Sequence, residues 1–431
     1  MSGAGRWRSC LGFVLRQRRP PRAQYGGQAR LNRLRLALIM TLSPAALDRI
    51  EAVRRIAREV AGPAAEAVDR DGRFLREAID ALKAEQLLSA YVPESLGGKG
   101  ASIVELGLMC EALGQRCASA AMVFAMHQVQ VACLVRHGHT PYFQAYLNEL
   151  VREQRLIASV TSEAGVGGSV RTSICNIEQE GDTCHVRKDG TVVSYGEDGE
   201  DFLMTVRRTQ SSAASDQALV LVNKRQCSMQ ITSTWDAMGM RGTCSPGYVI
   251  EARFQPDQIV PDPFADINAH TMVPWAHILW SSGWLGIATD AVTRARAFVR
   301  DTAKRMGGAT PPTAARLSEV ASKLTLMRTQ VRERAAYYDM LTRQADGGKD
   351  MLSSVGFAVE LNHLKLNASE LVAEICTKAL RITGTTGYRN DSPYSVTRHL
   401  RDAHSAALMI GNERIHAANG ALHLVFKDDV L

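Results

Sequence analysis

RITGTTGYRNDSPYSVTRHLRDAHSAALMIGNERI, residues 381–415, is the stretch from which the fold can be inferred. Gly384, Gly387 and Tyr388 form a turn of small residues after a long helical pattern, and Arg398–Ala403 opens a second helical run. Glycines in such a turn let another group approach the backbone closely, which suits a bound phosphate or dinucleotide. The stretch therefore predicts two helices joined by a turn that faces a ligand.

The rest of the chain divides into segments of different periodicity. Apolar residues recur at helical spacing in residues 44–154, and short apolar or alternating runs typical of strands follow in residues 157–254. Helical spacing then returns in long stretches whose lengths suggest a four-helix bundle. The predicted strands are 157–161, 181–185, 191–193, 202–206, 218–222 and 248–254, and the predicted bundle helices are 274–305, 313–344, 351–382 and 395–425.

These patterns predict an α+β protein. We expect an N-terminal helical domain (residues 40–155), a middle β-domain (156–265) and a C-terminal helical bundle (266–431), preceded by a basic unstructured extension (1–39).

The positive charge of the chain is confined to that extension. The net charge is +7, and residues 1–39 contain nine Arg but no Lys, Asp or Glu. The remainder is close to neutral, so no basic face for nucleic acid is expected. Richness in Arg also suits a transit peptide to an organelle matrix, but Pro20-Pro21 and Gly26-Gly27 interrupt any amphipathic helix. We favour a non-structural extension ahead of a helix that starts with Ser43 as its N-cap.

Cysteine usage favours a reducing compartment. The nine Cys are scattered, odd in number and contain no CxxC pair, which is typical of free thiols in a cytoplasmic protein. No apolar run approaches the roughly 20 residues that a membrane span needs, so no membrane span is expected.

Leu400-Arg401-Asp402-Ala403, together with the glycine turn before it, resembles the C-terminal signature of the acyl-CoA dehydrogenase family. In that family an I-x-G-G-x-G-Y turn precedes an L-R-D-A helix that leads to the catalytic glutamate. The loop Val92–Gly100 is similar to the family's V-P-E-x-x-G-G-x-G loop. The resemblance covers residue 43 to the end and implies the acyl-CoA dehydrogenase fold.

Three stretches between the helical segments carry the same likeness. Val160–Gly165 resembles L-T-E-P-E-A-G, Thr191–Gly196 resembles T-W-I-T-N-G, and Met238–Thr243 is close to M-G-M-R-G-S/T. In the family these segments hold FAD, so the resemblance implies FAD as the cofactor. The cofactor-binding residues that it implies are Thr161, Ser162, Ser169, Ser194, Arg241, Gly384 and Gly387.

Two of these matches are incomplete. The family's Ser-Asp after the first loop is replaced by Val166-Gly167, so that hydroxyl is either lost or supplied by Ser169. Thr302 stands where the family carries an Arg that contacts the diphosphate, and Arg300 or Arg305 compensates unless the diphosphate is held otherwise. In the family the glycine turn reaches a neighbour's flavin, which implies a homodimer or homotetramer here.

The position of the family's catalytic glutamate is occupied by Ile410, and the alternative position on the first bundle helix by Ala276. We therefore expect another base, and prefer His127 to Glu413. The resemblance places His127 on the helix that faces the substrate, whereas Glu413 must reach back a helical turn. His277 and His404 are weaker candidates.

The resemblance implies a flavin-dependent oxidoreductase that dehydrogenates an acyl thioester at the α,β position, with coenzyme A or a carrier protein as carrier and an electron-transfer partner. A flavin monooxygenase on the same fold is an alternative, because it needs no carboxylate base. A non-redox member that only binds acyl thioesters is another.

Overall fold

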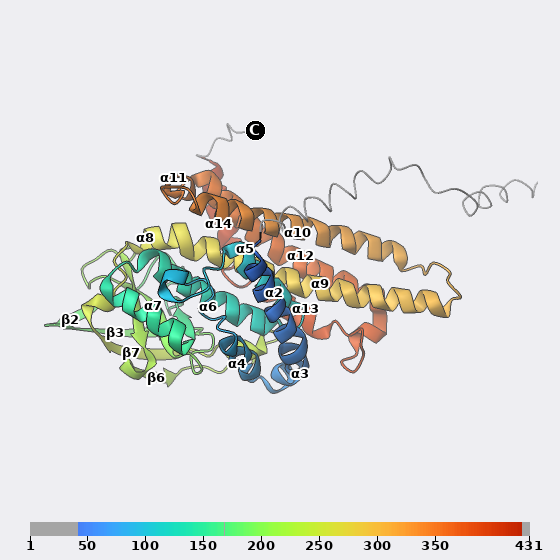
Figure 1. Ribbon diagram of the computed structural model, residues 1–431, viewed down its shortest axis with the longest axis horizontal. Helices are drawn as coiled ribbons and strands as arrows, with labels where there is room; N and C mark the ends of the chain where they lie inside the picture. The colour runs from blue at the N-terminus through green and yellow to red at the C-terminus, as the bar shows by residue number, and fades with distance from the viewer. Residues whose placement is uncertain (1–41, 168, 425–431) are drawn as a thin grey trace, which may run out of the picture. The chain divides into compact units, whose positions relative to one another are not determined.

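Figure 1 shows a computed structural model of the protein, which describes residues 42–167 and 169–424. The predicted extension, residues 1–39, lies outside the described residues. The contacts given below lie either within residues 42–48 or among residues 49–424.

The first described part of the chain is helical, as predicted. Ser43 Oγ accepts a hydrogen bond from the Ala46 N–H at 3.2 Å, so Ser43 caps the first helix. Ser102 and Glu105 form the reciprocal capping box that their spacing suggests. The helices are α2 (Pro44–Ile56), α3 (Gly62–Asp71), α4 (Arg76–Ala84), α5 (Ile103–Gly114), α6 (Ala118–His137) and α7 (Pro141–Glu153).

Two sheets follow the helices. One has the order β1-β4-β5, with β1 parallel to β4, and the other is antiparallel with the order β2-β3-β7-β6. Burial alternates along β7, whereas β4 and β5 are buried along almost their whole length. The strands are β1 (Ile157–Val160), β2 (Glu178–Glu180), β3 (Thr183–Gly190), β4 (Asp201–Arg207), β5 (Gln217–Asn223), β6 (Cys227–Ile231) and β7 (Tyr248–Phe254).

The strand prediction needs correction at three places. Residues 191–193 form no strand; Val193 N–H instead donates to Pro246 O in a turn. The sequence analysis also missed β2, a short edge strand with every residue exposed, and β6, which is mostly exposed. Neither strand shows the apolar alternation on which the prediction relied.

Long helices make up the last part of the chain. They are α9 (Val273–Arg305), α10 (Ala314–Thr342) and α12 (Val355–Tyr388), with the short helices α8 (Phe264–Ile267), α11 (Lys349–Leu352), α13 (Thr397–Ala403) and α14 (Asn412–His423). The predicted fourth helix, 395–425, is therefore wrong as one element, since residues 404–411 separate α13 from α14. The α+β class and the helical, β, helical order are confirmed.

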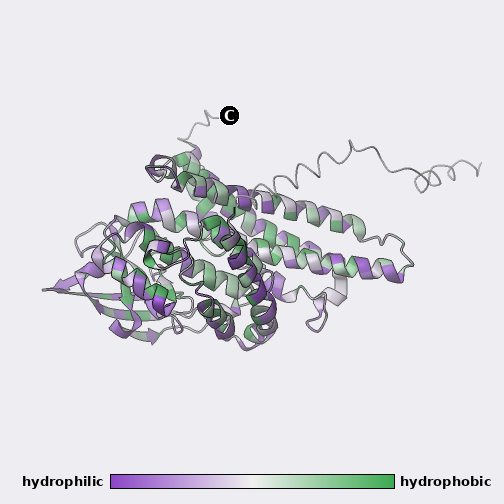
Figure 2. Cartoon of the chain, in the orientation of Figure 1, coloured by the Kyte–Doolittle hydropathy of each residue, from purple (hydrophilic) through white to green (hydrophobic). Residues whose placement is uncertain are grey.

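Hydropathy explains how the helices pack. α6 and the first turns of α9 are buried almost throughout, while the C-terminal end of α9, rich in Arg, is drawn purple in Figure 2. Among the described residues, α6 alone has the length and composition of a membrane-spanning helix, a run that the sequence analysis missed. Because 89% of its apolar window is buried inside the protein, α6 is a core helix.

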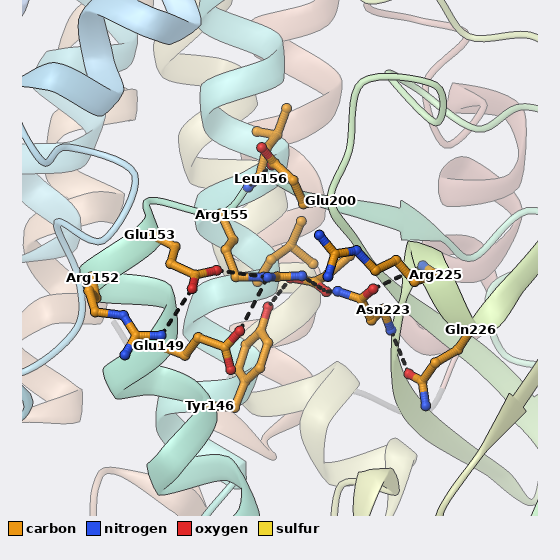
Figure 3. Close-up of polar contacts among 12 residues, drawn as sticks. Tyr146, Glu149, Arg152, Glu153, Arg155, Leu156, Glu200, Asn223, Arg225 and Gln226 are labelled. Atoms are coloured by element: carbon orange, nitrogen blue, oxygen red, sulfur yellow. Dashed lines mark hydrogen bonds and ion pairs between the residues drawn. The ribbon is translucent and has the colours of Figure 1, made fainter.

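A buried carboxylate joins the last helix before the sheets to β4. Asp201, only 1% exposed, accepts two hydrogen bonds from the Arg155 guanidinium, at 2.5 and 2.7 Å. The Tyr146 hydroxyl and the Asn223 amide donate to the same carboxylate at 2.8 and 2.9 Å. Figure 3 shows Tyr146, Arg155 and Asn223 converging from α7, the following turn and β5. This network fixes how α7 meets the first sheet.

Asp201→Ala should therefore lower the free energy of unfolding by about 3–5 kcal/mol, because it leaves the Arg155 charge and the Tyr146 hydroxyl without their buried acceptor. Urea unfolding followed by circular dichroism measures the loss. Glu153→Gln is the matched control, since Glu153 contacts the same Arg155 at the surface and should change little. Equal losses in the two variants would contradict the role given to Asp201.

Candidate functional site

The turn Met238–Thr243 packs directly on α13, which lies far away in the sequence. The Met240 N–H donates to Asp402 Oδ1 at 2.7 Å, and Arg401 Nη1 donates to Met238 O at 2.8 Å. A Cβ on Gly239 would lie 2.3 Å from Arg401 O, so only glycine fits at this position. Two of the motifs singled out in the sequence therefore form one surface.

Arg241 belongs to this surface as a tie between segments. Its Nε donates to Asp69 O at 2.7 Å, and its Nη1 donates to Asp236 Oδ1 at 2.8 Å and to Ala237 O at 2.9 Å. These bonds hold the turn to the end of α3. The N–H groups on Nε and Nη1, three of the five donors of the guanidinium, therefore have protein partners. The two N–H groups on Nη2 are the ones that can meet a phosphate.

A chain of buried hydroxyls runs from the same turn to Ser194. Thr243 Oγ1 lies 2.8 Å from Ser245 Oγ, which donates to Ser194 Oγ at 2.9 Å. Ser194 is 9% exposed, and Val192, two residues after the end of β3, is 45% exposed. The chain fixes the Ser194 hydroxyl at the edge of the β-domain, where a planar ring could contact it.

The loop after β1 is fastened to the same edge. Ser162 Oγ donates to Val192 O at 2.8 Å and accepts from Val192 N–H at 3.1 Å. The Ser162 side chain thus joins the loop after β1 to the segment around Val192. Because the side chain is engaged there, only the Ser162 backbone is free to contact a cofactor. Thr161 beside it is half-buried.

A buried ion pair that the sequence analysis missed supports this loop. Lys188 Nζ lies 3.1 Å from Glu163 Oε2, and neither side chain is more than 5% exposed. The second carboxylate oxygen accepts from the N–H groups of Ile174 and Cys175. The Lys188 ammonium and these donors hold the pKa of Glu163 below its usual range despite burial. The alternation of β3 could have indicated Lys188, because it occupies an inward position.

Ser169 and the two glycines lie elsewhere. Ser169 is half-buried and its Oγ accepts from Arg171 N–H at 3.3 Å within its own turn. Gly384 has φ 58° and ψ −145°, a conformation confined to glycine, and it kinks α12 with open space around its Cβ position. Gly387 is close-packed instead, since a Cβ there would lie 1.9 Å from Thr383 Oγ1. Only Gly384 offers the open backbone that the turn was predicted to provide.

His127 has no nitrogen free for catalysis. It is fully buried in α6, where Nδ1 accepts from the Ile157 N–H at 3.0 Å and Nε2 donates to Leu88 O at 2.8 Å. Burial lowers its pKa to about 4. This geometry contradicts the prediction that His127 is the base. The ring connects the segment after α4 to β1.

Glu413 is exposed in the first turn of α14, and His404 is exposed as well. Ile410 is half-buried with φ 50°, a left-handed conformation that is unusual for a β-branched residue, and Ala276 is 4% exposed in α9. The structure therefore places no carboxylate at either position where the sequence analysis looked for the base.

A lysine approaches the Ile410 backbone instead. Lys365 of α12 is fully buried, and its Nζ donates to Ile410 O at 2.8 Å and to Asn412 Oδ1 at 2.6 Å. Burial lowers the pKa of Lys365 to about 8. The sequence analysis missed this residue, although a Lys in helical register with Leu361 and Val372 on an apolar face was a readable signal.

Comparison with known proteins gives a consistent picture. The family description "Acyl-CoA dehydrogenase, N-terminal domain" matches residues 45–154, and "Acyl-CoA dehydrogenase, C-terminal domain" matches residues 269–424, together more than half of the chain. The chain is 24% identical over 370 residues to the probable acyl-CoA dehydrogenase FadE25 of Mycobacterium tuberculosis, covering 84% of this chain and 91% of the relative.

A nitrososynthase and a monooxygenase are similar to the chain as well. The amino sugar nitrososynthase DnmZ of Streptomyces peucetius is 24% identical over 367 residues, covering 80% of this chain and 86% of the relative. The FMN-bound structure of TdsC, a dibenzothiophene monooxygenase from Paenibacillus sp. A11-2, superposes with a TM-score of 0.76 at 18% identity, covering 88% and 97% of the two chains. The last likeness shows a shared fold.

Asp402 gives the site a testable pH dependence. Burial raises its pKa to about 6, so the folded chain favours the protonated carboxyl more than the unfolded chain does. The resulting stability is fully present below the unfolded pKa and is lost as pH rises through about 6. Compared with Asp402→Asn, the wild-type protein should lose about 2 kcal/mol between pH 4 and pH 7. Urea midpoints at each pH measure this, with the surface variant Asp391→Asn as control; parallel pH curves for wild type and Asp402→Asn would contradict it.

Proposed function

The chain belongs to the acyl-CoA dehydrogenase family, and from that premise we propose that it is a flavin-dependent oxidoreductase whose catalytic step uses no carboxylate base. The observation that carries this proposal is the pair of apolar side chains, Ile410 and Ala276, at the positions where the family places that base. Two observations on the substitutes expected from the sequence support the proposal: both ring nitrogens of His127 have hydrogen-bond partners, and Glu413 is exposed in the first turn of α14.

The cofactor proposal rests on the surface formed by the flavin-type motifs. The Ser194 hydroxyl, the backbone around Ser162 and the turn at Met238–Thr243 would hold the flavin ring, and Gly384 would meet the adenylate half of FAD in an assembled dimer or tetramer. A bound flavin would supply hydride acceptance, or oxygen activation once it is reduced. FAD is our choice over FMN because Gly384 keeps an open backbone at the position of the family's glycine turn.

Reduced-flavin monooxygenation is the reaction class that fits best. It requires no removal of a proton from carbon by the protein, so apolar side chains at both base positions are compatible with it. The fold shared with TdsC, a dibenzothiophene monooxygenase, is compatible with this class.

Dehydrogenation of an acyl thioester is the second candidate. The match to FadE25 along most of both chains favours it, with coenzyme A or a carrier protein as the carrier and an electron-transfer partner as the acceptor. This reaction needs a base from another part of the chain.

The cofactor proposal can be tested with the glycine that the turn requires. Purified protein should bind FAD or FMN on reconstitution, and Gly239→Val should weaken flavin binding by at least about tenfold, because the new side chain collides with Arg401 O and displaces the turn. Flavin fluorescence titration measures both affinities. Gly420→Ala on exposed α14 is the control, since nothing lies near its Cβ position. Failure of the wild-type protein to bind either flavin would refute the cofactor assignment.

The reaction class can be tested at Ile410. In anaerobic titrations with butyryl-CoA, the wild-type flavin should not bleach, whereas Ile410→Glu should gain bleaching, because a positioned general base contributes about 10²–10⁴-fold to the rate. With reduced flavin, the wild-type protein should consume oxygen. Rapid bleaching of the wild-type flavin would show instead that the protein is a dehydrogenase with another base, and absence of both activities would favour a non-redox binding role.

A further inference from the structure

α9 and α12 meet along a polar seam in the middle of the C-terminal helices. His277, Ser281 and Trp284 follow one another at intervals of four and three residues, so they share one face of α9. His277 Nδ1 lies 3.3 Å from Leu361 O of α12, and the Trp284 ring centroid lies 6.0 Å from Lys365 Nζ. All of these side chains are at least 98% buried. The seam therefore places a lysine among polar groups inside the protein.

The positive charge of Lys365 has no carboxylate partner there. Its two hydrogen-bond acceptors, Ile410 O and Asn412 Oδ1, are neutral, and within residues 42–167 and 169–424 no ion pair reaches its Nζ. Two titratable groups act on the Lys365 ammonium through space, His277 of α9 and Glu370 of α12. α14 contributes only the neutral Asn412. In the described part of the chain, no charged group of α10 or α13 bonds to Lys365.

His277 adds no compensating charge. Burial, and then the Lys365 charge, lower its pKa to about 3, so the imidazole stays neutral. Desolvation is likewise what lowers the pKa of Lys365 to about 8. A buried ammonium that faces only neutral acceptors is costly unless an anion joins it.

The seam also contains donors without acceptors. Trp284 Nε1, Ser281 Oγ and the indole nitrogen of half-buried Trp280 have no hydrogen-bond partner among the described residues. Lys365 keeps a third N–H beyond the two that it donates. His277 Nε2 is the one unpaired ring acceptor of the seam within the described residues, because Nδ1 faces a backbone carbonyl of α12. Buried donors are normally paired, so four unused donors beside one acceptor point to a further acceptor that is missing.

The position of the seam connects it to the proposed reaction. Lys365 donates to the backbone carbonyl of Ile410, and His277 directly follows Ala276 along α9, so two residues of the seam neighbour the positions at which the family places its base. A group bound at the seam would belong to a molecule that occupies the substrate side of the site.

We propose that the seam between α9 and α12 binds a carboxylate carried by the substrate, with the Lys365 ammonium as its counterion and Trp284 Nε1 and Ser281 Oγ as further donors. The substrate is then an organic acid with a free carboxylate, and a plain hydrocarbon chain is disfavoured there. This inference rests on the proposed function for the identity of the site, whereas the binding it requires can be measured without turnover.

Succinate is the probe, with the neutral diamide succinamide beside it. Calorimetry at pH 8.5 in two buffers of different ionisation enthalpy should show succinate binding with uptake of roughly 0.7 proton, because the bound anion restores the charge of a lysine whose pKa is about 8. Lys365→Met should weaken binding by at least about thirtyfold and abolish the proton uptake. Trp284→Phe, which keeps an aromatic ring but removes the indole N–H, should weaken succinate binding by about tenfold.

Lys378→Met is the matched control on α12, because Lys378 pairs with Glu319 at the surface and should leave succinate binding unchanged. The proposal would be overturned if the wild-type protein did not bind succinate, or if it bound succinamide or chloride as tightly as succinate. Unchanged succinate affinity in Trp284→Phe would overturn it as well. Flavin titration of the same samples is independent, so a protein that binds flavin but not succinate refutes the seam alone.

Discussion

The hydrogen bond from the Met240 N–H to the Asp402 carboxylate is the contact on which the candidate site depends. It brings a turn between strands onto a short helix that lies 162 residues later in the chain. Burial disfavours the charged carboxylate of Asp402 and so raises its pKa, and the hydrogen bond from the Met240 N–H lowers that pKa in part. Because Gly239 lets Arg401 O approach closely, the bond can form only when both motifs adopt these conformations. Ser194 and Ser162 are then positioned relative to this junction through their own hydroxyl contacts.

The electrostatics of the site differ from those of its family. A carboxylate base would place negative charge beside the substrate, whereas this chain has Ile410 at that position and a buried ammonium behind its backbone. A cation there cannot remove a proton while it is charged, but it stabilises bound anions and oxygen atoms that gain negative charge. Ile410 has a left-handed backbone, and its carbonyl accepts a hydrogen bond from Lys365. Ile410 at the family's base position and the approach of Lys365 to its carbonyl therefore involve two residues far apart in sequence.

Sequence patterns were reliable where one local property decided the structure. The capping box at Ser102 and Glu105, the N-cap at Ser43 and the long bundle helices follow from spacing alone. The pattern failed for β2 and β6, which have exposed side chains, and for the fourth bundle helix, whose apolar spacing continues through the non-helical residues 404–411. In those places backbone pairing with β3 and β7, or the contact with Lys365, decides the conformation.

The sequence by itself determined the class of fold and the order of the motifs, because these depend on residue type and spacing, and its resemblance to the family showed apolar residues, Ile410 and Ala276, at the base positions. Only the tertiary structure decided which titratable groups are available. His127 is saturated by Leu88 O and Ile157 N–H, partners that lie 39 and 30 residues away, so no local pattern could reveal that its nitrogens are occupied. Lys365 is informative for the same reason: burial and the absence of a nearby anion set its proton affinity, and both arise only when α9, α12 and the segment before α14 come together.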